Sequence, residues 1–289
     1  MIDYFLHLLI LICIYVILVS SLNIAVGFSG ILHLGHIALF GVGAYTSAIL
    51  VFAGVPFLVS LLIAGLFTGL IGICLGVASG KLRGDYLSLA TLAFGFVAHS
   101  IMMNWVMFTR GPLGLSGIPP AALFGITLQS PYAYAGFALF VAGCSVWFFH
   151  LLVSSPFGKL MEGLRDDELN LRVLGKNTYL VKIKVLFVSA FFSGIAGSMF
   201  AHYIGYIDPS SFVLGEMIFI LTLVIAGGLA SLRGSVVATI VLFMIPELLR
   251  FVSISGAVLG PVRQLFYCVV LLLVLYVRPS GIFGKVDLR

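Results

Sequence analysis

Charged residues are scarce in this sequence. Lys, Arg, Asp and Glu together account for 9% of its 289 residues, against about 25% in an ordinary soluble domain. Hydrophobic residues make up 62% of the chain. So few charges cannot cover a water-soluble surface, and so large an apolar fraction excludes an intrinsically disordered chain. The composition therefore predicts an integral membrane protein.

Sequence motifs for catalysis and nucleotide binding are absent. No Walker A motif, HExxH, GxSxG or strand-following GxGxxG occurs. The four cysteines lie in apolar runs without CxxC spacing or neighbouring histidines, which indicates neither a disulfide framework nor a metal site. The basic residues form no stripe of the kind that binds nucleic acid. We expect no enzyme activity, no metal or cofactor bound by this chain, and no nucleic-acid partner.

Long apolar runs are what the sequence does contain. A helix needs about 20 apolar residues to cross a hydrocarbon core of about 30 Å. The runs predict an all-α polytopic membrane protein, a bundle of about nine (8–10) transmembrane helices that forms a single domain over residues 1–289. The expected spans are 4–22, 35–53, 57–79, 86–108, 131–153, 182–204, 213–230, 234–252 and 261–278.

The few positive charges predict the orientation in the membrane. Twelve of the 15 Lys and Arg residues fall in one set of alternate loops, and basic loops face the cytoplasm. This places the 154–181 loop and the C-terminus in the cytoplasm. With nine spans the N-terminus lies outside, whereas a tenth span hidden in 20–53 would turn it inward.

Two segments carry features beyond hydropathy. Residues 23–45 contain five glycines, two histidines and Asn23 at membrane depth, which fits either close helix packing or an interrupted helix that lines a cavity. His33 and His36 are more typical of packing histidines than of ligands. The loop 109–130 is apolar and rich in Gly and Pro, so we expect it to pack over the outer mouth of the bundle.

The cytoplasmic loop 155–177 holds the densest charge in the chain, with four acids and four bases. Apolar residues recur among them and Gly175 is suited to end a helix. Such an amphipathic helix could lie on the membrane surface, but the balanced charge is poor for anionic lipid. A docking element for a cytosolic partner is the favoured interpretation.

A set of motifs, in this order, resembles one known family: NIAVGFSGILHLGHIALFGVGAY (23–45), RGDYLSLATLAFG (83–95), GPLGLSGIP (111–119), SPFGKLMEGLRDDELNLRVLGKN (155–177), DPSSF (208–212), GGLASLRGSV (227–236), PELLR (246–250) and RPSGIFG (278–284). The chain is similar to the LivM-type permease subunit of bacterial ATP-binding-cassette (ABC) importers for branched-chain amino acids, within the LivH/LivM permease family.

The resemblance implies a multi-pass permease of the bacterial inner membrane that works by alternating access. It implies four kinds of partner besides the lipid bilayer: a second, LivH-like permease, two cytosolic ABC ATPases that hold the ATP and Mg²⁺, and a periplasmic solute-binding protein. The substrate expected is Leu, Ile or Val. Relatives that carry urea or another small polar solute, and a stand-alone secondary transporter or channel, are the alternatives.

The resemblance also implies roles for particular residues. Residues 158–175 would contain one cytoplasmic coupling helix that docks on an ATPase through Gly158, Glu162, Arg165, Asp166, Asp167, Glu168 and Gly175. Candidates for lining the pathway are Asn23, His36, Tyr45, Tyr86 and Thr91. His33, Phe96 and Arg110 depart from the usual family pattern, which leaves the transported solute open.

Overall fold

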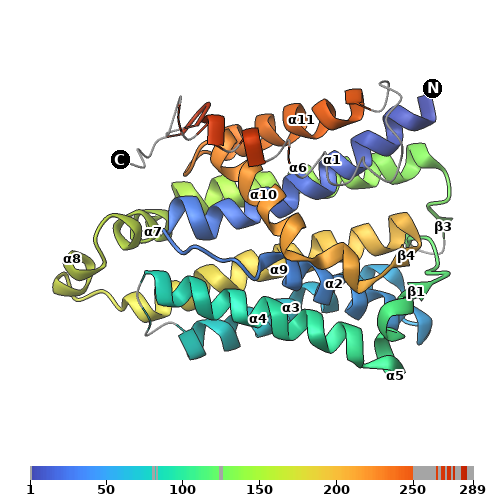
Figure 1. Cartoon of the computed structure of the whole chain (residues 1–289), viewed down its shortest axis with the longest axis horizontal. Helices are drawn as coiled ribbons and strands as arrows, with labels where there is room; N and C mark the ends of the chain where they lie inside the picture. The colour runs from blue at the N-terminus through green and yellow to red at the C-terminus, as the bar shows by residue number, and fades with distance from the viewer. Residues whose placement is uncertain are drawn as a thin grey trace.

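The computed structural model describes residues 2–79, 82, 84–123 and 126–249, and, nearer the C-terminus, 265, 268–270, 272–274, 276 and 281–284. Most of the long helices run side by side along one axis, whereas α10 crosses them obliquely (Figure 1). The long helices are α1 (Ile2–Asn23), α2 (His36–Phe52), α3 (Phe57–Ser79), α4 (Asp85–Asn104), α6 (Pro131–Ser154), α9 (Thr178–Ile204), α10 (Leu214–Gly227) and α11 (Leu232–Leu249).

Shorter elements join the long helices. A π-helical turn, Ile24–Phe28, extends α1, and 3-10 turns cover Gly111–Leu113 and Pro209–Phe212. The remaining helices are α5 (Val106–Thr109), α7 (Pro156–Asp166) and α8 (Glu168–Val173). Two antiparallel pairs of two-residue strands complete the described chain: β1 (Leu115–Ser116) with β4 (Tyr206–Ile207), and β2 (Ala122–Leu123) with β3 (Ile126–Thr127).

The prediction of an all-α polytopic membrane protein is confirmed. Within the described residues, five helices are long and apolar enough to cross a membrane, and shorter apolar helices accompany them. Eight of the nine predicted spans each coincide with one of the long helices. The predicted ninth span, 261–278, lies largely outside the described residues.

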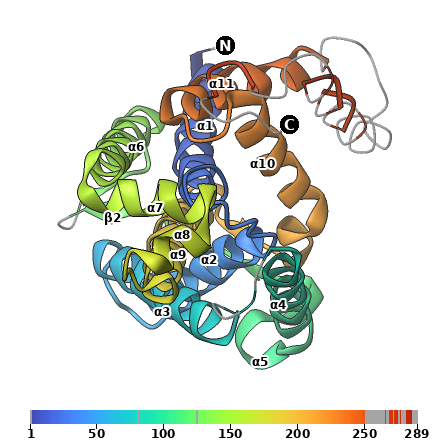
Figure 2. The same ribbon diagram turned by 90° about the vertical axis from the view of Figure 1, so that its left-hand side faces the viewer.

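Helices α1, α2 and α9 form the centre of the bundle, and Figure 2 shows the other helices around them. The central helices are mostly buried, including Ile14 and Ile17 of α1. Glycines allow α2 and α9 to approach closely: a Cβ added to Gly43 or to Gly197 would overlap backbone atoms of the facing helix. Small residues at such contacts let membrane helices pack without a hydrophobic driving force between them.

Both α2 and α10 begin inside the bundle and not at its end (Figure 1). Residues 29–35 are non-helical between the π-helical turn and α2, and residues 205–213, with their 3-10 turn, precede α10 in the same way. Helices of 17 and 14 residues rise about 26 and 21 Å, less than a core of about 30 Å. The glycine-rich segment 23–45 is therefore both interrupted and closely packed.

The prediction of one coupling helix over 158–175 is wrong in one respect, because the segment contains two helices. Asp167 has an extended backbone, and its carboxylate accepts hydrogen bonds from the amides of Leu169 and Asn170 at 2.8 and 3.1 Å. An aspartate that caps a new helix in this way competes with continuation of the previous one. The chain therefore turns between α7 and α8.

The loop 109–130 lies at the end of the bundle opposite α7 and α8 (Figure 1). Ile118 and Ala121 are buried there, and the Pro119 carbonyl contacts His202 Nδ1 of α9 at 2.8 Å. Arg110 adopts the left-handed conformation with φ 58°, which favours glycine. The loop is thus tied to the bundle, as its apolar composition predicts.

Candidate functional site

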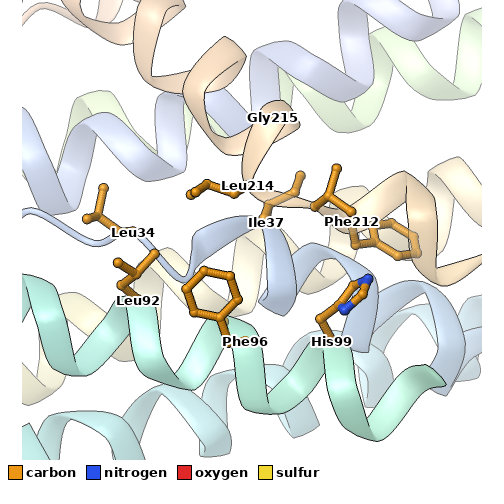
Figure 3. A pocket seen from close by; sticks show the side chains of 10 residues that line it. Leu34, Ile37, Leu92, Phe96, His99, Phe212, Leu214 and Gly215 are labelled. Atoms are coloured by element: carbon orange, nitrogen blue, oxygen red, sulfur yellow. The ribbon is translucent and has the colours of Figure 1, made fainter. Parts of the chain in front are cut away.

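A pocket of about 250 Å³ lies where the two interrupted helices meet α4 (Figure 3). One wall comes from α4, and the opposite walls come from the start of α2 and the start of α10. The lining residues are Leu34, Ile37, Leu92, Gly95, Phe96, His99, Phe212, Val213, Leu214 and Gly215. Three segments that are far apart in the sequence therefore build one site.

Contacts between α4 and the break before α2 fix one side of the pocket. The Leu34 amide donates a hydrogen bond to Thr91 Oγ1 at 3.1 Å, and the Thr91 hydroxyl donates to the Ser88 carbonyl at 2.9 Å. A Cβ on Gly35 would overlap the Thr91 carbonyl oxygen, and one on Gly95 would lie 3.5 Å from the Gly35 Cα. The absence of a side chain at Gly35 therefore lets the break lie directly against α4, with Gly95 in ordinary contact beside it.

Aromatic packing fixes the other side. The ring of Phe212, which is 2% exposed, lies edge-on to Phe40 and to Tyr45 of α2, with centroid separations of 5.6 and 6.1 Å. This contact holds the chain immediately before α10 against α2. Leu214 therefore begins its helix at the pocket.

The pocket combines apolar walls with two helix N-termini. The first amides of a helix have no intrahelical acceptor, and the helix dipole places partial positive charge there. His99 is the titratable residue that lines the pocket. The start of α2 suits an anionic group, whereas the first turn of α10 already contains Glu216. An apolar group fits against Leu34, Leu92 and Phe96.

None of the five residues suggested for the pathway is among the residues that line this pocket, although His36 and Thr91 directly precede the lining residues Ile37 and Leu92. Asn23 is fully buried, and its amide donates to the Ser231 carbonyl at 3.2 Å and to Ser235 Oγ at 2.6 Å. His36 Nε2 lies 3.0 Å from Ser21 Oγ. These contacts join α1 to α11 and α1 to α2.

The other three candidates have different surroundings. Thr91 supports the pocket through Leu34, as described above. Tyr45 faces a separate crevice between α2, α3 and α4. Tyr86 is 72% exposed near the start of α4.

Sequence reasoning missed His99 and Phe212 as site residues. The motifs TLAFG and DPSSF contain Gly95 and Phe212, which are signals near the pocket. Neither motif indicates by itself that α4 and the start of α10 face each other.

His33 lies in the break, fully buried. Neither of its ring nitrogens has a hydrogen-bond partner among the residues that the structure describes. Its ring is edge-on to that of His36, with centroids 5.6 Å apart. The break therefore contains an imidazole with unmet hydrogen-bonding capacity.

The α7–α8 segment contacts the end of α1 through Arg165. The Arg165 Nη1 donates to the Gly27 carbonyl at 3.2 Å, and its Nε pairs with Asp166 at 2.8 Å. Gly30, with φ 68°, packs on the Arg165 side chain. This arginine thus joins the cytoplasmic segment to the first residues of the break.

The neighbouring acids have three different environments. The Asp166 side chain is 66% exposed, and Asp167 caps α8. Glu168 faces inward, where Lys182 Nζ and Thr178 Oγ1 donate to it at 3.1 Å each and Arg172 forms an ion pair with it. Partial burial alone would raise the pKa of Glu168, but the bonds from Lys182, Arg172 and Thr178 outweigh it and hold that pKa below its ordinary value.

Three further coupling candidates are placed as follows. Gly158 is buried in the first turn of α7, where its amide donates to Ser155 Oγ at 3.4 Å. Glu162 is half-buried on α7. Gly175 has φ 73° and follows α8, as expected of a residue that ends a helix.

The part of the chain that the structure describes contains no group of three or more His, Cys, Asp or Glu side chains that could hold a metal ion.

Comparison with known proteins identifies the family. The model of the family described as "Branched-chain amino acid transport system / permease component" matches residues 4–276. The chain is 34% identical over 294 residues to the high-affinity branched-chain amino acid transport system permease protein LivM of Escherichia coli (strain K12), which covers 93% of this chain and 67% of that protein. No solved structure matches the chain.

More distant relatives are also permeases. The probable branched-chain amino acid transport permease protein LivM of Methanocaldococcus jannaschii is 24% identical over 236 residues, which cover 79% of this chain and 68% of that protein. The autoinducer 2 import system permease protein LsrC of Salmonella typhi is 28% identical over 177 residues, or 60% and 46% of the two chains. The chain belongs to the family of branched-chain amino acid transport permeases and is a permease subunit of an ABC importer.

Proposed function

We propose that this chain forms part of the translocation pathway for Leu, Ile or Val, and that the pocket between α4 and the starts of α2 and α10 is its substrate subsite. The pocket is the observation that carries the proposal. Its apolar lining matches an aliphatic side chain, and the helix N-terminus at the start of α2 matches a carboxylate. Apolar walls of this kind favour an aliphatic amino acid over urea.

The pocket opens toward a second permease subunit in this proposal. Phe96 is 57% exposed and Leu214 is 41% exposed, although both line the pocket. A LivH-like subunit packed on α4 and α10 would enclose the substrate between the two chains. A periplasmic binding protein would deliver the substrate to this pair.

Energy for transport comes from two separate ATPases, because this sequence has no nucleotide-binding motif. The α7–α8 segment is the proposed coupling element. Its exposed surface includes Leu169, Val173 and Leu174, which are 57%, 85% and 73% exposed. Apolar side chains exposed on a charged cytoplasmic segment are typical of an interaction surface.

Arg165 gives this coupling a direct route into the bundle. A shift of α7 would move the guanidinium that holds the Gly27 carbonyl. The break after Gly27 leads to Leu34 and Ile37, which line the pocket. Movement at the ATPase surface would thus reach the subsite through one side chain and one short segment.

The orientation proposed is the one that the basic loops favour, with α7, α8 and the C-terminus in the cytoplasm of a bacterial cell. The N-terminus lies at the opposite end of the bundle from α7 and α8 (Figure 1). At the other end of the chain, the amides of Ile282 and Phe283 donate to the Ala226 and Gly227 carbonyls at 3.0 and 3.1 Å, at the end of α10.

Replacement of Gly95 by Leu tests the subsite, because it fills the pocket with an apolar side chain from a good helix former. We expect uptake of labelled leucine by vesicles that contain the assembled importer to fall about tenfold or more, since a loss of about 1.4 kcal/mol in binding is already tenfold in affinity. Gly143→Leu is the matched control on α6, where an added Cβ meets nothing within 4 Å.

Two results would separate the parts of this proposal. Equal leucine uptake by the Gly95→Leu and Gly143→Leu variants would place the subsite elsewhere. If unlabelled Leu, Ile and Val did not compete with the uptake of labelled leucine by the unmodified importer, branched-chain amino acids would be excluded as its substrates, whichever pocket is used.

A further inference from the structure

A second cavity of about 580 Å³ lies on the other side of α4, in a crevice between α2, α3 and α4. Its walls include Ile49 of α2, Ile63 and Phe67 of α3, and Val97 and Ile101 of α4. Phe67, Val97 and Ile101 are about half exposed, at 48%, 57% and 48%. The crevice is therefore open along its length and almost entirely apolar.

The depth of the crevice corresponds to one leaflet of a bilayer. Its lining on α4 runs from Phe94 to Met102, and Trp105 continues it just past the end of that helix. The interval from Phe94 to Trp105 corresponds to about 16 Å at the rise of a helix, against about 15 Å for half of the hydrocarbon core. At the Trp105 end, the rings of Trp105 and Phe108 lie edge-on with centroids 4.8 Å apart. Tryptophan and other aromatic residues concentrate at the membrane–water interface.

A cationic site continues the crevice at that interface. A cavity of about 370 Å³, lined in part by Arg110 and Ser116, shares Ile49 and Phe108 with the crevice. Arg110 is exposed, and within the described residues it makes no ion pair. Its φ of 58° is uncommon for a residue with a side chain, which marks this position as one that its surroundings hold in place.

We propose that a phospholipid binds this chain with one acyl chain in the α2–α3–α4 crevice and its phosphate at the Arg110 guanidinium. The lipid comes from the leaflet opposite α7 and α8. The apolar walls match an acyl chain, and the depth of the crevice matches the length of that chain in one leaflet. The Arg110 guanidinium at the Trp105 end matches the phosphate. An acyl chain there would fill the gap behind α4, the helix that forms one wall of the substrate pocket.

Fluorescence quenching tests the site, because Trp105 lies at its mouth and the chain has only two tryptophans. In the full chain with Trp147→Phe, phosphatidylglycerol brominated on its acyl chains should quench Trp105 with saturation. Arg110→Gln should raise the half-saturating lipid concentration about fivefold, which corresponds to the loss of about 1 kcal/mol for one basic residue at a membrane surface. Arg110→Lys, which keeps the charge, should bind nearly as the parent does.

Three further arms make the result decisive. Brominated diacylglycerol lacks the phosphate and should quench the parent and the Arg110→Gln variant equally, and inorganic phosphate should not displace phosphatidylglycerol. Ala98→Phe, which fills the crevice, should abolish saturation. Non-saturable quenching that is the same in all variants would show that Trp105 contacts only the general lipid layer around the protein, which would exclude a specific phospholipid site. Protection of Trp105 in the assembled importer would show that another subunit covers the crevice, which would also overturn it.

Discussion

Glu168 shows how one side chain can belong to the folded framework although its sequence context resembles a docking surface. It follows two other acids, Asp166 and Asp167, in a charged loop. Its carboxylate nevertheless turns inward to Lys182, whose own side chain is 5% exposed. Lys182 Nζ also donates to the Leu82 carbonyl at 3.2 Å.

Replacement of Glu168 by Ala should destabilise the protein at neutral pH, by about 1–3 kcal/mol, because a buried ammonium would lose a charged partner. The pKa of Glu168 is lowered in the folded state from its ordinary value of 4.5. Its contribution is therefore fully present above that value and is lost as pH falls through the lower folded pKa. Thermal unfolding at pH 7 and at a series of pH values that fall below 4.5 measures the change.

Asp166→Ala is the adjacent control, since the Asp166 side chain is 66% exposed. It should leave the unfolding temperature nearly unchanged at both pH values. A destabilisation by Glu168→Ala that did not shrink in acid would contradict this role for the ion pair.

For single residues, the residue type predicts which hydrogen bonds and ion pairs a side chain can form, but not which residues it forms them with. Asn23 is predicted to line the pathway, and as a buried amide it needs partners. Its partners, Ser231 and Ser235, lie more than 200 positions away along the chain, and local patterns contain no information on such contacts. For the same reason the inward direction of Glu168 could not be predicted from its neighbours.

Among the helices, α2 and α9 pack closely because glycines lie at their contact. Gly197→Ala should destabilise the bundle by about 1–3 kcal/mol, because the added methyl group overlaps the Phe40 carbonyl oxygen and overpacking of this kind forces the backbones apart. Its better helix propensity offsets only about 1 kcal/mol. Thermal unfolding of the purified chain in detergent measures the difference.

Gly143→Ala in α6 gives the opposite expectation, because space around that position is open. It should be neutral or slightly stabilising. If both alanines had the same effect, the close approach of α2 and α9 would not contribute to stability.

The long helices were predictable because each coincides with a long apolar run. The predicted spans 35–53 and 213–230 even begin within one residue of α2 and α10. What the sequence did not show is that these starts lie inside the bundle, where the Leu34 amide donates to Thr91 Oγ1. The turn between α7 and α8 depends on which amides the Asp167 carboxylate caps, and a continuous amphipathic helix satisfies the same apolar pattern.

For the whole importer, the exposed apolar surface of α8 predicts where the ATPase docks. Val173→Asp should reduce the amount of ATPase that copurifies with the permease, because a carboxylate would be desolvated in an apolar contact. Val173→Thr has nearly the same shape and should retain most of the ATPase. Normal copurification with Val173→Asp, in protein that elutes at the same size, would exclude this surface.

The proposed substrate subsite illustrates the limit of sequence reasoning at this scale. Its three walls lie near residues 34–37, 92–99 and 212–215, and no periodicity in the sequence relates them. The motifs at 23–45, 83–95 and 208–212 contain only some of these residues. Their meeting point follows only from the packing of α4 on the two interrupted helices.

The buried imidazole of His33, for which the described residues offer no hydrogen-bond partner, has a consequence for the populations of the conformations of the molecule. A buried polar group that loses its partner costs about 1–3 kcal/mol, and each 1.4 kcal/mol changes the ratio of two populations about tenfold. Conformations that differ in what reaches the His33 ring, water or another side chain, therefore differ in free energy on this scale. A mutation at His33 would change the resting populations without touching substrate or ATPase.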